Sequence, residues 1–230
     1  LLINDLVKWK NNPNRKPLIL NGARQVGKTW LLQNFGKEEY KSVAYINCER
    51  SENLDFVFED FNVRRIIMAM SAMSGVDILP NETLIIVDEI QDYPRALTAL
   101  KYFCEDAPEY HVAVAGSLLG IMLHSGVSFP VGKVNMLNLY PMNFEEFLMA
   151  MGKEQALHAL HSGDWKLINA LAPMYIDMLR QYYYVGGMPA VVKSYVENYS
   201  LMQVREMQKQ ILFDYSHDFS KHTVSKEIPR

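Results

Sequence analysis

An eight-residue turn between a short apolar run and a segment with helical spacing narrows the folds open to this chain. The turn consists of Gly22, Ala23, Arg24, Gln25, Val26, Gly27, Lys28 and Thr29. It matches the pattern GxxxxGK[ST] at every fixed position, and a chance match in a chain of this length is expected about once in a hundred. Leu18 to Leu20 before the turn predict a strand, and Trp30 to Phe35 after it predict a helix. The pattern therefore predicts a phosphate-binding loop, or P-loop, in an α/β fold.

Apolar runs and helical patterns alternate as far as about residue 140, which is typical of βα units around a mostly parallel sheet. Further strands are expected over 42–48, 84–87, 111–115 and 134–140. Gly75 is expected to end a buried helix that begins at Arg64, and Gly36 to end the helix after the turn. Strand signals then fade. We predict a P-loop NTPase core with a mostly parallel five-stranded sheet over residues 1–150, followed by a smaller helical domain over 151–230.

A second motif places two carboxylates directly after a buried strand. Leu84 to Val87 are apolar, and Asp88 and Glu89 follow at once. The carboxyl ends of parallel strands share one edge of the sheet, which is where the P-loop also begins. We predict that the catalytic Lys28 bridges β- and γ-phosphates, and that Thr29 and Asp88 hold Mg²⁺. Glu89 is the predicted general base for the attacking water, and an ordinary acidic strand end facing solvent is the alternative.

Four more polar residues have roles that the sequence leaves open. Ser117 follows the fourth expected strand and either contacts the γ-phosphate or the water, as a catalytic residue, or caps the next helix. Arg24, Arg95 and Lys133 are candidate cations for charge that develops on the phosphate. A solvated surface side chain is the favoured interpretation of Arg95 and Lys133.

Composition excludes several classes of protein. With 230 residues, 49% of them hydrophobic, and a formal charge of −3, the chain is globular and lacks the basic excess of a general nucleic-acid or membrane-surface binder. Cys48 and Cys104 lack zinc-site spacing and predict reduced thiols in a cytoplasmic protein. No apolar run approaches about 18 residues, so no membrane span is expected. The chain begins at Leu1 rather than Met, from which we expect trimmed ends.

Five ordered motifs resemble one known family. They are GARQVGKT at 22–29, LIIVDEIQ at 84–91, VAGSLL at 114–119, LYPMNFEEF at 139–147 and VGGMP at 185–189. Together they resemble prokaryotic P-loop ATPases of the AAA_14 type with a DUF4143 C-terminal region, near the AAA+ and signal-transducing ATPases. The resemblance implies that Gly22 to Thr29 are Walker A, that Asp88 and Glu89 are Walker B, and that Ser117 stands at the sensor position.

The same resemblance carries expectations for the rest of the chain. Signal-transducing relatives have a Gly-x-Pro element whose proline leans on adenine, which makes Pro189 a candidate contact for the base, with a turn between two helices as the favoured alternative. Family members place an arginine where this chain has Lys133, so an arginine finger is left unassigned. Members also extend further at the C-terminus, and the helical region is therefore expected to be truncated.

The leading hypothesis is Mg²⁺-dependent binding and hydrolysis of ATP, coupled to movement between core and helical domain. The main alternative is a switch that holds ADP, exchanges it slowly and binds a protein or nucleic-acid partner. A P-loop kinase ranks lower, because residues 96–150 contain no arginine for a lid. The expected ligand is ATP or ADP. A protein partner is expected but cannot be named. A nucleic-acid partner is possible, although the net charge does not support it, and the sequence leaves oligomerisation open.

Overall fold

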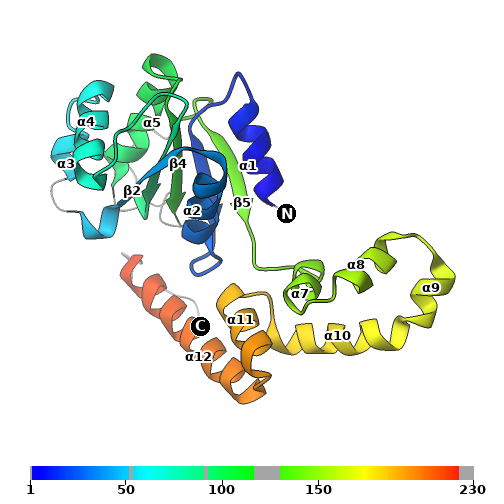
Figure 1. Cartoon of the computed structure of the whole chain (residues 1–230). Coiled ribbons are helices and arrows are strands. Elements are labelled where there is room, and N and C mark those ends of the chain that lie inside the picture. The colour runs from blue at the N-terminus through cyan, green and yellow to red at the C-terminus, as the bar shows by residue number, and fades with distance from the viewer. Residues whose placement is uncertain (1, 52–53, 91–92, 117–129, 223–230) are drawn as a thin grey trace. The chain divides into compact units, whose positions relative to one another are not determined.

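A five-stranded parallel sheet forms the centre of the chain, seen in a computed structural model that describes residues 2–51, 54–90, 93–116 and 130–222 (Figure 1). The strands lie in the order β2-β3-β4-β1-β5. They are β1 (Leu18–Gly22), β2 (Ser42–Asn47), β3 (Thr83–Asp88), β4 (His111–Gly116) and β5 (Asn135–Leu139). Every neighbouring pair is parallel. The predicted α/β class and its parallel five-stranded sheet are confirmed.

Helices cover both faces of this sheet (Figure 1). One face carries α1 (Leu2–Asn11) and α2 (Lys28–Glu39), and the other carries α3 (Leu54–Val57), α4 (Val63–Ser74) and α5 (Pro94–Asp106). Successive side chains of a strand point to opposite faces. Leu84 and Ile86 accordingly pack in the core under α1 and α2, whereas Ile85 and Val87 pack under α3 to α5. The strand that precedes Asp88 is thus anchored on both sides.

The chain divides into two compact units, Leu1–Leu139 and Tyr140–Arg230. The second unit is helical over the residues described. Its helices are α7 (Phe144–Ala150), α8 (Glu154–His161), α9 (Trp165–Ala170), α10 (Ala172–Val185), α11 (Pro189–Asn198) and α12 (Leu201–His222). The division falls before the boundary expected near residue 150, because Phe147 of α7 is buried with Val185 and Val191 rather than against the sheet. The helix α7 therefore belongs to the helical unit.

Two glycines that were expected to end helices behave differently. Gly75 ends α4 in the left-handed conformation, with φ of 68°, and its N–H donates to the Ser71 carbonyl. Gly36 does not end α2, which continues to Glu39. A Cβ at Gly36 would lie 2.6 Å from Cγ2 of Val43, so this glycine serves the close packing of helix on strand. The helix instead ends where Tyr40 turns into extended backbone.

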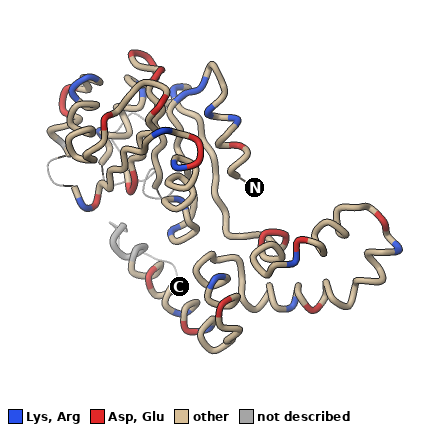
Figure 2. Tube along the Cα trace, viewed as in Figure 1, with Lys and Arg blue, Asp and Glu red and all other residues tan. Residues whose placement is uncertain are grey.

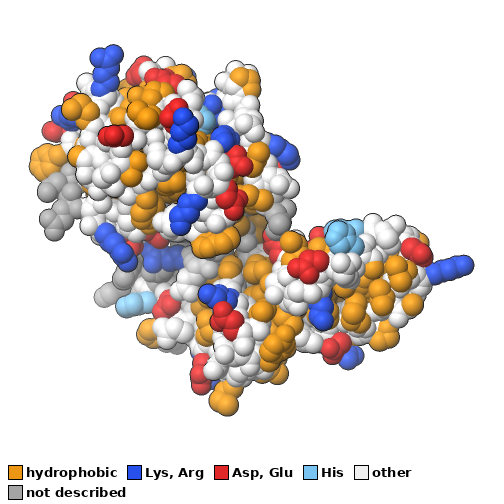
Figure 3. All heavy atoms as spheres, in the orientation of Figure 1, with side chains coloured by type: hydrophobic (Ala, Val, Ile, Leu, Met, Phe, Trp, Pro, Cys, Tyr) orange, Lys and Arg blue, Asp and Glu red, His pale blue; other side chains and the backbone are white. Residues whose placement is uncertain are grey.

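Charge and apolar surface are distributed without a simple division between the units. Basic residues (Lys and Arg) and acidic residues (Asp and Glu) occur together along the trace of both units (Figure 2). Hydrophobic side chains reach the surface over α9 and α10 (Figure 3), and Trp165 and Ile176 are among the exposed ones. Among the helices that the structure describes, none combines the length and apolar character needed to cross a membrane.

Candidate functional site

The turn between β1 and α2 presents backbone amides at the start of a helix. Gln25 and Gly27 have positive φ angles of 63° and 93°, which tightens the turn. The cap residue of α2 is Gly27, which has no side chain to accept a hydrogen bond from the first amides of the helix. Amides at a helix start and in such turns bind anionic oxygens. The backbone therefore has the form that a phosphate group requires.

The first glycine of the turn is required by packing. A Cβ on Gly22 would lie 2.3 Å from the carbonyl oxygen of Leu139 on the neighbouring strand β5. The two residues are paired in the sheet register. A side chain at this position would therefore push β1 and β5 apart at the edge where the turn begins.

Lys28 is enclosed by the turn that it follows. Its side chain belongs to a residue only 8% exposed, and Nζ donates to the carbonyl oxygens of Gly22 at 2.9 Å and of Ala23 at 2.7 Å. Burial lowers the pKa of this ammonium group, and the carboxylates of Glu89 and Asp88 oppose that shift. The charge of Lys28 is thus held at the turn itself.

Asp88 collects donors from three directions. It is 2% exposed and ends β3. Its Oδ2 accepts a hydrogen bond from Oγ1 of Thr29 at 2.6 Å and another from Oη of Tyr45 at 2.9 Å. The N–H of Glu89 donates to Oδ1 at 3.1 Å. The predicted pair Thr29 and Asp88, which are 59 residues apart in sequence, is therefore in direct contact.

The backbone at Glu89 is unusual. Its φ angle is 54°, in the left-handed region that residues with a Cβ rarely adopt. Such a conformation costs on the order of 1–3 kcal/mol unless surrounding structure compensates. The bond from its N–H to the Asp88 carboxylate supplies one such compensation. The second predicted acid thus lies immediately beside the first, on a turn held by the first.

Asn21 adds a buried polar atom next to the turn. It is 1% exposed on β1, between Gly116 of β4 and Asn138 of β5 in the sheet register. Among the residues described, its Oδ1 has no hydrogen-bond partner. A buried oxygen of this kind costs free energy, and such atoms gather at functional sites. Neither motif contains Asn21, so the sequence offered no reason to select it.

Two further candidates contact other groups, and a third lies outside the described residues. Lys133 precedes β5, at the opposite edge of the sheet, and forms an ion pair with Glu105 at 2.8 Å. The prediction of Lys133 as a candidate cation for the turn is therefore wrong. Because β5 runs parallel to β1, the residue before β5 lies at the amino-terminal edge of the sheet, whereas the turn follows the carboxyl-terminal edge. Arg95 lies in the first turn of α5, donates to the carbonyl of Glu59 and stacks on Phe61, with its Cζ 5.3 Å from the centroid of the ring. Ser117 lies outside the described residues.

The Gly-Met-Pro element belongs to the helical unit. Pro189 opens α11 in its first turn, as the interpretation of a turn between two helices predicts. A Cβ on Gly187 would lie 2.1 Å from the Met142 carbonyl, and Met142 N–H donates to the Gly187 carbonyl at 2.7 Å. Backbone packing alone thus accounts for the glycine. The contact of Pro189 with adenine stays a prediction.

Tyr45 is a second site residue that sequence reasoning missed. It lies on β2 opposite Ile86 of β3, two positions before the pair of Asn47 and Asp88. Nothing in SVAYINC marks a tyrosine as functional, because aromatic residues are common in strands. Knowledge that β2 neighbours β3 would have placed it beside the acidic strand end.

One protein family and several solved structures are similar to this chain. A family profile described as "AAA_14: AAA domain" matches residues 14–148. The chain also resembles the Drosophila ORC bound to DNA at 16% identity, with TM-score 0.49, over 98% of this chain and 68% of that one. For the Thermotoga maritima RuvB Holliday junction branch migration motor the identity is 13% and the TM-score 0.47, over 91% of this chain and 60% of that one.

A third structure, C. elegans PCH-2, has 10% identity and a TM-score of 0.39, over 70% of this chain and 46% of that one. The chain thus spans less than half the length of that protein. No curated protein sequence matches the chain. All three TM-scores lie below 0.5, so the assignment to a family rests on the sequence profile.

Proposed function

Since the chain belongs to the AAA_14 family of AAA domains, we propose that it binds ATP together with Mg²⁺ and hydrolyses it. One observation carries this proposal. The hydroxyl of Thr29, in the turn, lies 2.6 Å from the carboxylate of Asp88 at the end of β3. The turn and the acidic strand end therefore lie in contact, which supports the proposal that they form one nucleotide site.

The residues present fit both parts of the ligand. Backbone amides after Gly27 and the ammonium of Lys28 would bind the phosphate oxygens, with Lys28 exchanging its contacts to Gly22 and Ala23 for contacts to the β- and γ-phosphates. A hydroxyl and a carboxylate form a hard oxygen donor pair, which Mg²⁺ prefers alongside substrate phosphates. Thr29 and Asp88 would hold this ion, which withdraws charge from the phosphates.

Glu89 would act on water as general base. Its carboxylate takes one proton from a water molecule while the water oxygen forms a bond to the γ-phosphorus. The bond from that phosphorus to the bridging oxygen breaks, and ADP leaves with the electron pair. Lys28 stabilises the charge that gathers on the bridging oxygen and the γ-phosphate. The water oxygen stays on the released phosphate, and Glu89 passes the proton it accepted to solvent when the products leave, so no further reactant is needed.

The Glu89→Gln variant tests the proposal most directly. We expect phosphate release from MgATP to fall by about a hundredfold or more, because general-base catalysis contributes about 10²–10⁴. Binding of ATP, measured by calorimetry, should persist, because Lys28 and the amides are intact. The matched control is Glu109→Gln, an exposed acid just before β4 at the opposite edge of the sheet. Unchanged turnover in Glu89→Gln would refute the role of Glu89.

The slow switch is the alternative outcome of the same measurement. A purified wild-type chain that retains ADP through gel filtration and shows no multiple turnover would support the switch over the ATPase. Both alternatives require nucleotide binding, so a wild-type chain that binds neither ATP nor ADP would exclude both.

We propose further that hydrolysis is coupled to a movement between the α/β unit and the helical unit. The support is the division of the chain at Leu139 and Tyr140, directly after the strand that pairs with Gly22. Small-angle X-ray scattering of Glu89→Gln with ATP and with ADP should give different radii of gyration. Equal radii in both states would contradict the coupling.

One further experiment tests which partners the protein has. A DUF4143 region stays a prediction from the resemblance, and an unnamed protein partner stays a prediction. An oligomer and a nucleic-acid partner are both open, and the rate of ATP hydrolysis per chain, measured against protein concentration with and without DNA, tests each of them. A rate that rises steeply with concentration indicates a site shared between copies, and stimulation by DNA indicates a nucleic-acid partner.

A further inference from the structure

We infer that Tyr45 is a positioning residue for the Mg²⁺ site, because its hydroxyl fixes the carboxylate of Asp88. The inference rests on the proposed function, since it concerns the ion that Thr29 and Asp88 would hold. It goes beyond the two motifs, neither of which contains a residue of β2.

The direction of the hydrogen bonds around Tyr45 is determined by chemistry. Nδ2 of Asn47 lies 3.4 Å from Oη of Tyr45, and Oη lies 2.9 Å from Oδ2 of Asp88. An amide nitrogen only donates, so the phenol oxygen accepts from Asn47. The single phenol proton is then directed to the carboxylate of Asp88.

Both carboxylate oxygens of Asp88 are thereby held by hydrogen bonds. Its Oδ2 accepts from hydroxyls of Thr29 and Tyr45, and its Oδ1 accepts from the N–H of Glu89. These donors come from α2, from β2 and from the turn after β3. Rotation of the carboxylate would break at least two of them. The remaining lone pair of Oδ1, which the N–H of Glu89 does not use, therefore points in a fixed direction. Hydrogen bonds from neighbouring groups orient metal ligands in this way.

The hydroxyl of Tyr45 is not needed to hold β2 in the sheet. The strands β2 and β3 are already paired at six positions, from Ser42 with Thr83 to Asn47 with Asp88. The ring of Tyr45 packs against the core under α1 and α2. Ring and ladder hold the strand, and the hydroxyl alone reaches the acidic residue. Removing only the hydroxyl therefore separates the two roles.

The test compares Tyr45→Phe with Tyr40→Phe. Tyr40 is a matched control, because its hydroxyl also bonds a neighbouring side chain, at 2.6 Å from Nδ1 of His111, but at the other edge of the sheet. Binding of Mn²⁺ to the ADP-loaded protein is measured by electron paramagnetic resonance. ADP affinity in EDTA is measured by calorimetry, and the midpoint of thermal unfolding checks the fold.

We expect Tyr45→Phe to weaken Mn²⁺ binding about tenfold, the usual size of an effect from a residue that orients a metal ligand. ADP affinity in EDTA should stay within about twofold of wild type, since the phosphate contacts are untouched. Turnover should recover as Mg²⁺ is raised. Tyr40→Phe should bind Mn²⁺ like wild type.

Unchanged or tighter Mn²⁺ binding by Tyr45→Phe would overturn the inference, and so would an equal loss of Mn²⁺ affinity in Tyr40→Phe. Failure of the proposed function looks different: the wild-type protein itself would then bind no ADP or hydrolyse no ATP. A wild-type protein that binds ADP and hydrolyses ATP, with a Tyr45→Phe variant that binds Mn²⁺ equally well, rejects only the role of Tyr45.

Discussion

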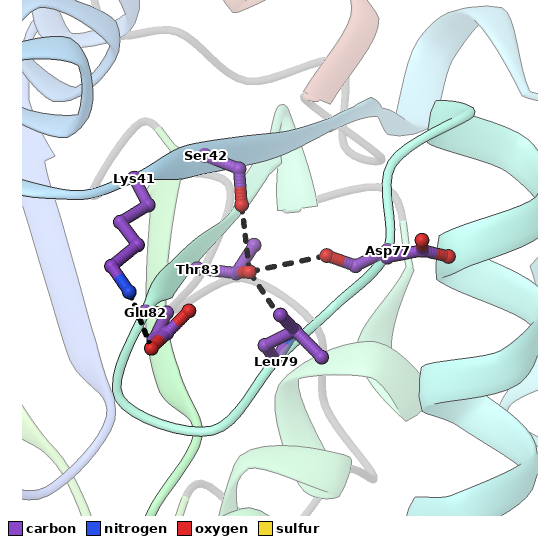
Figure 4. A network of polar contacts seen from close by, with 6 residues as sticks. All are labelled: Lys41, Ser42, Asp77, Leu79, Glu82 and Thr83. Carbon is purple, nitrogen blue, oxygen red and sulfur yellow. Dashed lines mark hydrogen bonds and ion pairs between the residues drawn. The ribbon is translucent and has the colours of Figure 1, made fainter.

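The two edges of the parallel sheet treat their polar side chains differently. At the amino-terminal edge, Thr83 is fully buried and uses its whole bonding capacity (Figure 4). Its hydroxyl donates to the Asp77 carbonyl at 3.2 Å, and accepts from Leu79 N–H at 3.0 Å and from Ser42 at 2.8 Å. An ion pair of Lys41 with Glu82 at 2.7 Å lies beside this network. This edge is closed by contacts within the protein.

The carboxyl-terminal edge instead contains features that cost stability. Lys28 has a pKa lowered by burial, Asn21 has a buried oxygen without a partner among the described residues, and Glu89 has a positive φ angle. Buried polar groups and strained backbone at one place are typical of a site organised for a ligand. The comparison teaches that one edge maintains the fold, while the other holds the proposed chemistry at some expense to stability.

The largest effect is expected from Lys28→Ala. Removing this buried charge should weaken ATP binding about a thousandfold, or about 4 kcal/mol, as for other truncated buried contacts to charged groups. Calorimetry measures the affinity. The control is Lys37→Ala, an exposed lysine in the last turn of the same helix, which should bind ATP normally. Equal affinity in Lys28→Ala and wild type would break the assignment of this edge to phosphate.

Lowering the pH should destabilise the fold through His111, at the amino-terminal edge of the sheet. Burial, followed by the charges of Arg15 and Lys10, lowers its pKa from 6.5 to about 4. Between these values the unfolded chain binds a proton that the folded chain does not, so stability falls as pH drops from 6.5 to 4 and this contribution then levels off. The loss is up to about 3 kcal/mol.

Urea unfolding at several pH values from 7 to 4 measures this loss. His111→Gln cannot titrate at this position, so its unfolding free energy should fall less steeply over the same range. Parallel curves for the variant and wild type would show that another group causes the acid sensitivity.

Thr83→Val should lower the stability of the fold without changing ATP affinity. Valine has a similar shape but leaves the Leu79 N–H and the Asp77 carbonyl without their shared partner, which should cost about 2 kcal/mol of unfolding free energy. Ser42→Ala removes one contact and should cost less. Neither should change ATP affinity, because about five residues of strand, or about 16 Å, separate Thr83 from Asp88. A loss of ATP affinity in Thr83→Val would show that the edges are coupled.

The smallest effect is a gain in stability from Glu89→Gly. Glycine adopts positive φ without strain, so the free energy of unfolding should rise by up to about 1 kcal/mol while turnover is lost. Glu89→Ala removes the same carboxylate but retains the strained backbone, and its stability should not rise. A similar gain in both variants would assign the cost to charge rather than to backbone.

Much of the α/β unit could be predicted because local patterns determine it. Leu84 to Val87 are apolar because both faces of β3 are covered, and the turn from Gly22 to Thr29 carries its own conformational signals. The proximity of Thr29 and Asp88 also follows from the pattern, since Asp88 ends β3 and Thr29 follows the turn that leaves the carboxyl end of the parallel strand β1.

Features that depend on the order of strands could not be predicted in this way. Tyr45 became visible only once β2 was seen beside β3, and Lys133 could be assigned to the amino-terminal edge only once β5 was seen to pair in parallel with β1. Gly36 has the appearance of a helix end in sequence, but its role depends on the distance to Val43. The positive φ of Glu89 has no local signal, because glutamate does not favour that conformation.

The position of β1 between β4 and β5 has a consequence for synthesis on the ribosome. The strand that leads into the turn leaves the ribosome early, yet both of its sheet neighbours are encoded far downstream, the second ending at Leu139. A nascent chain that stops short of β5 therefore has the whole nucleotide motif but lacks one wall of its support. Contacts of such long sequence separation also slow folding. Capture of nucleotide by the growing polypeptide should thus begin only after this last strand has emerged from the exit tunnel.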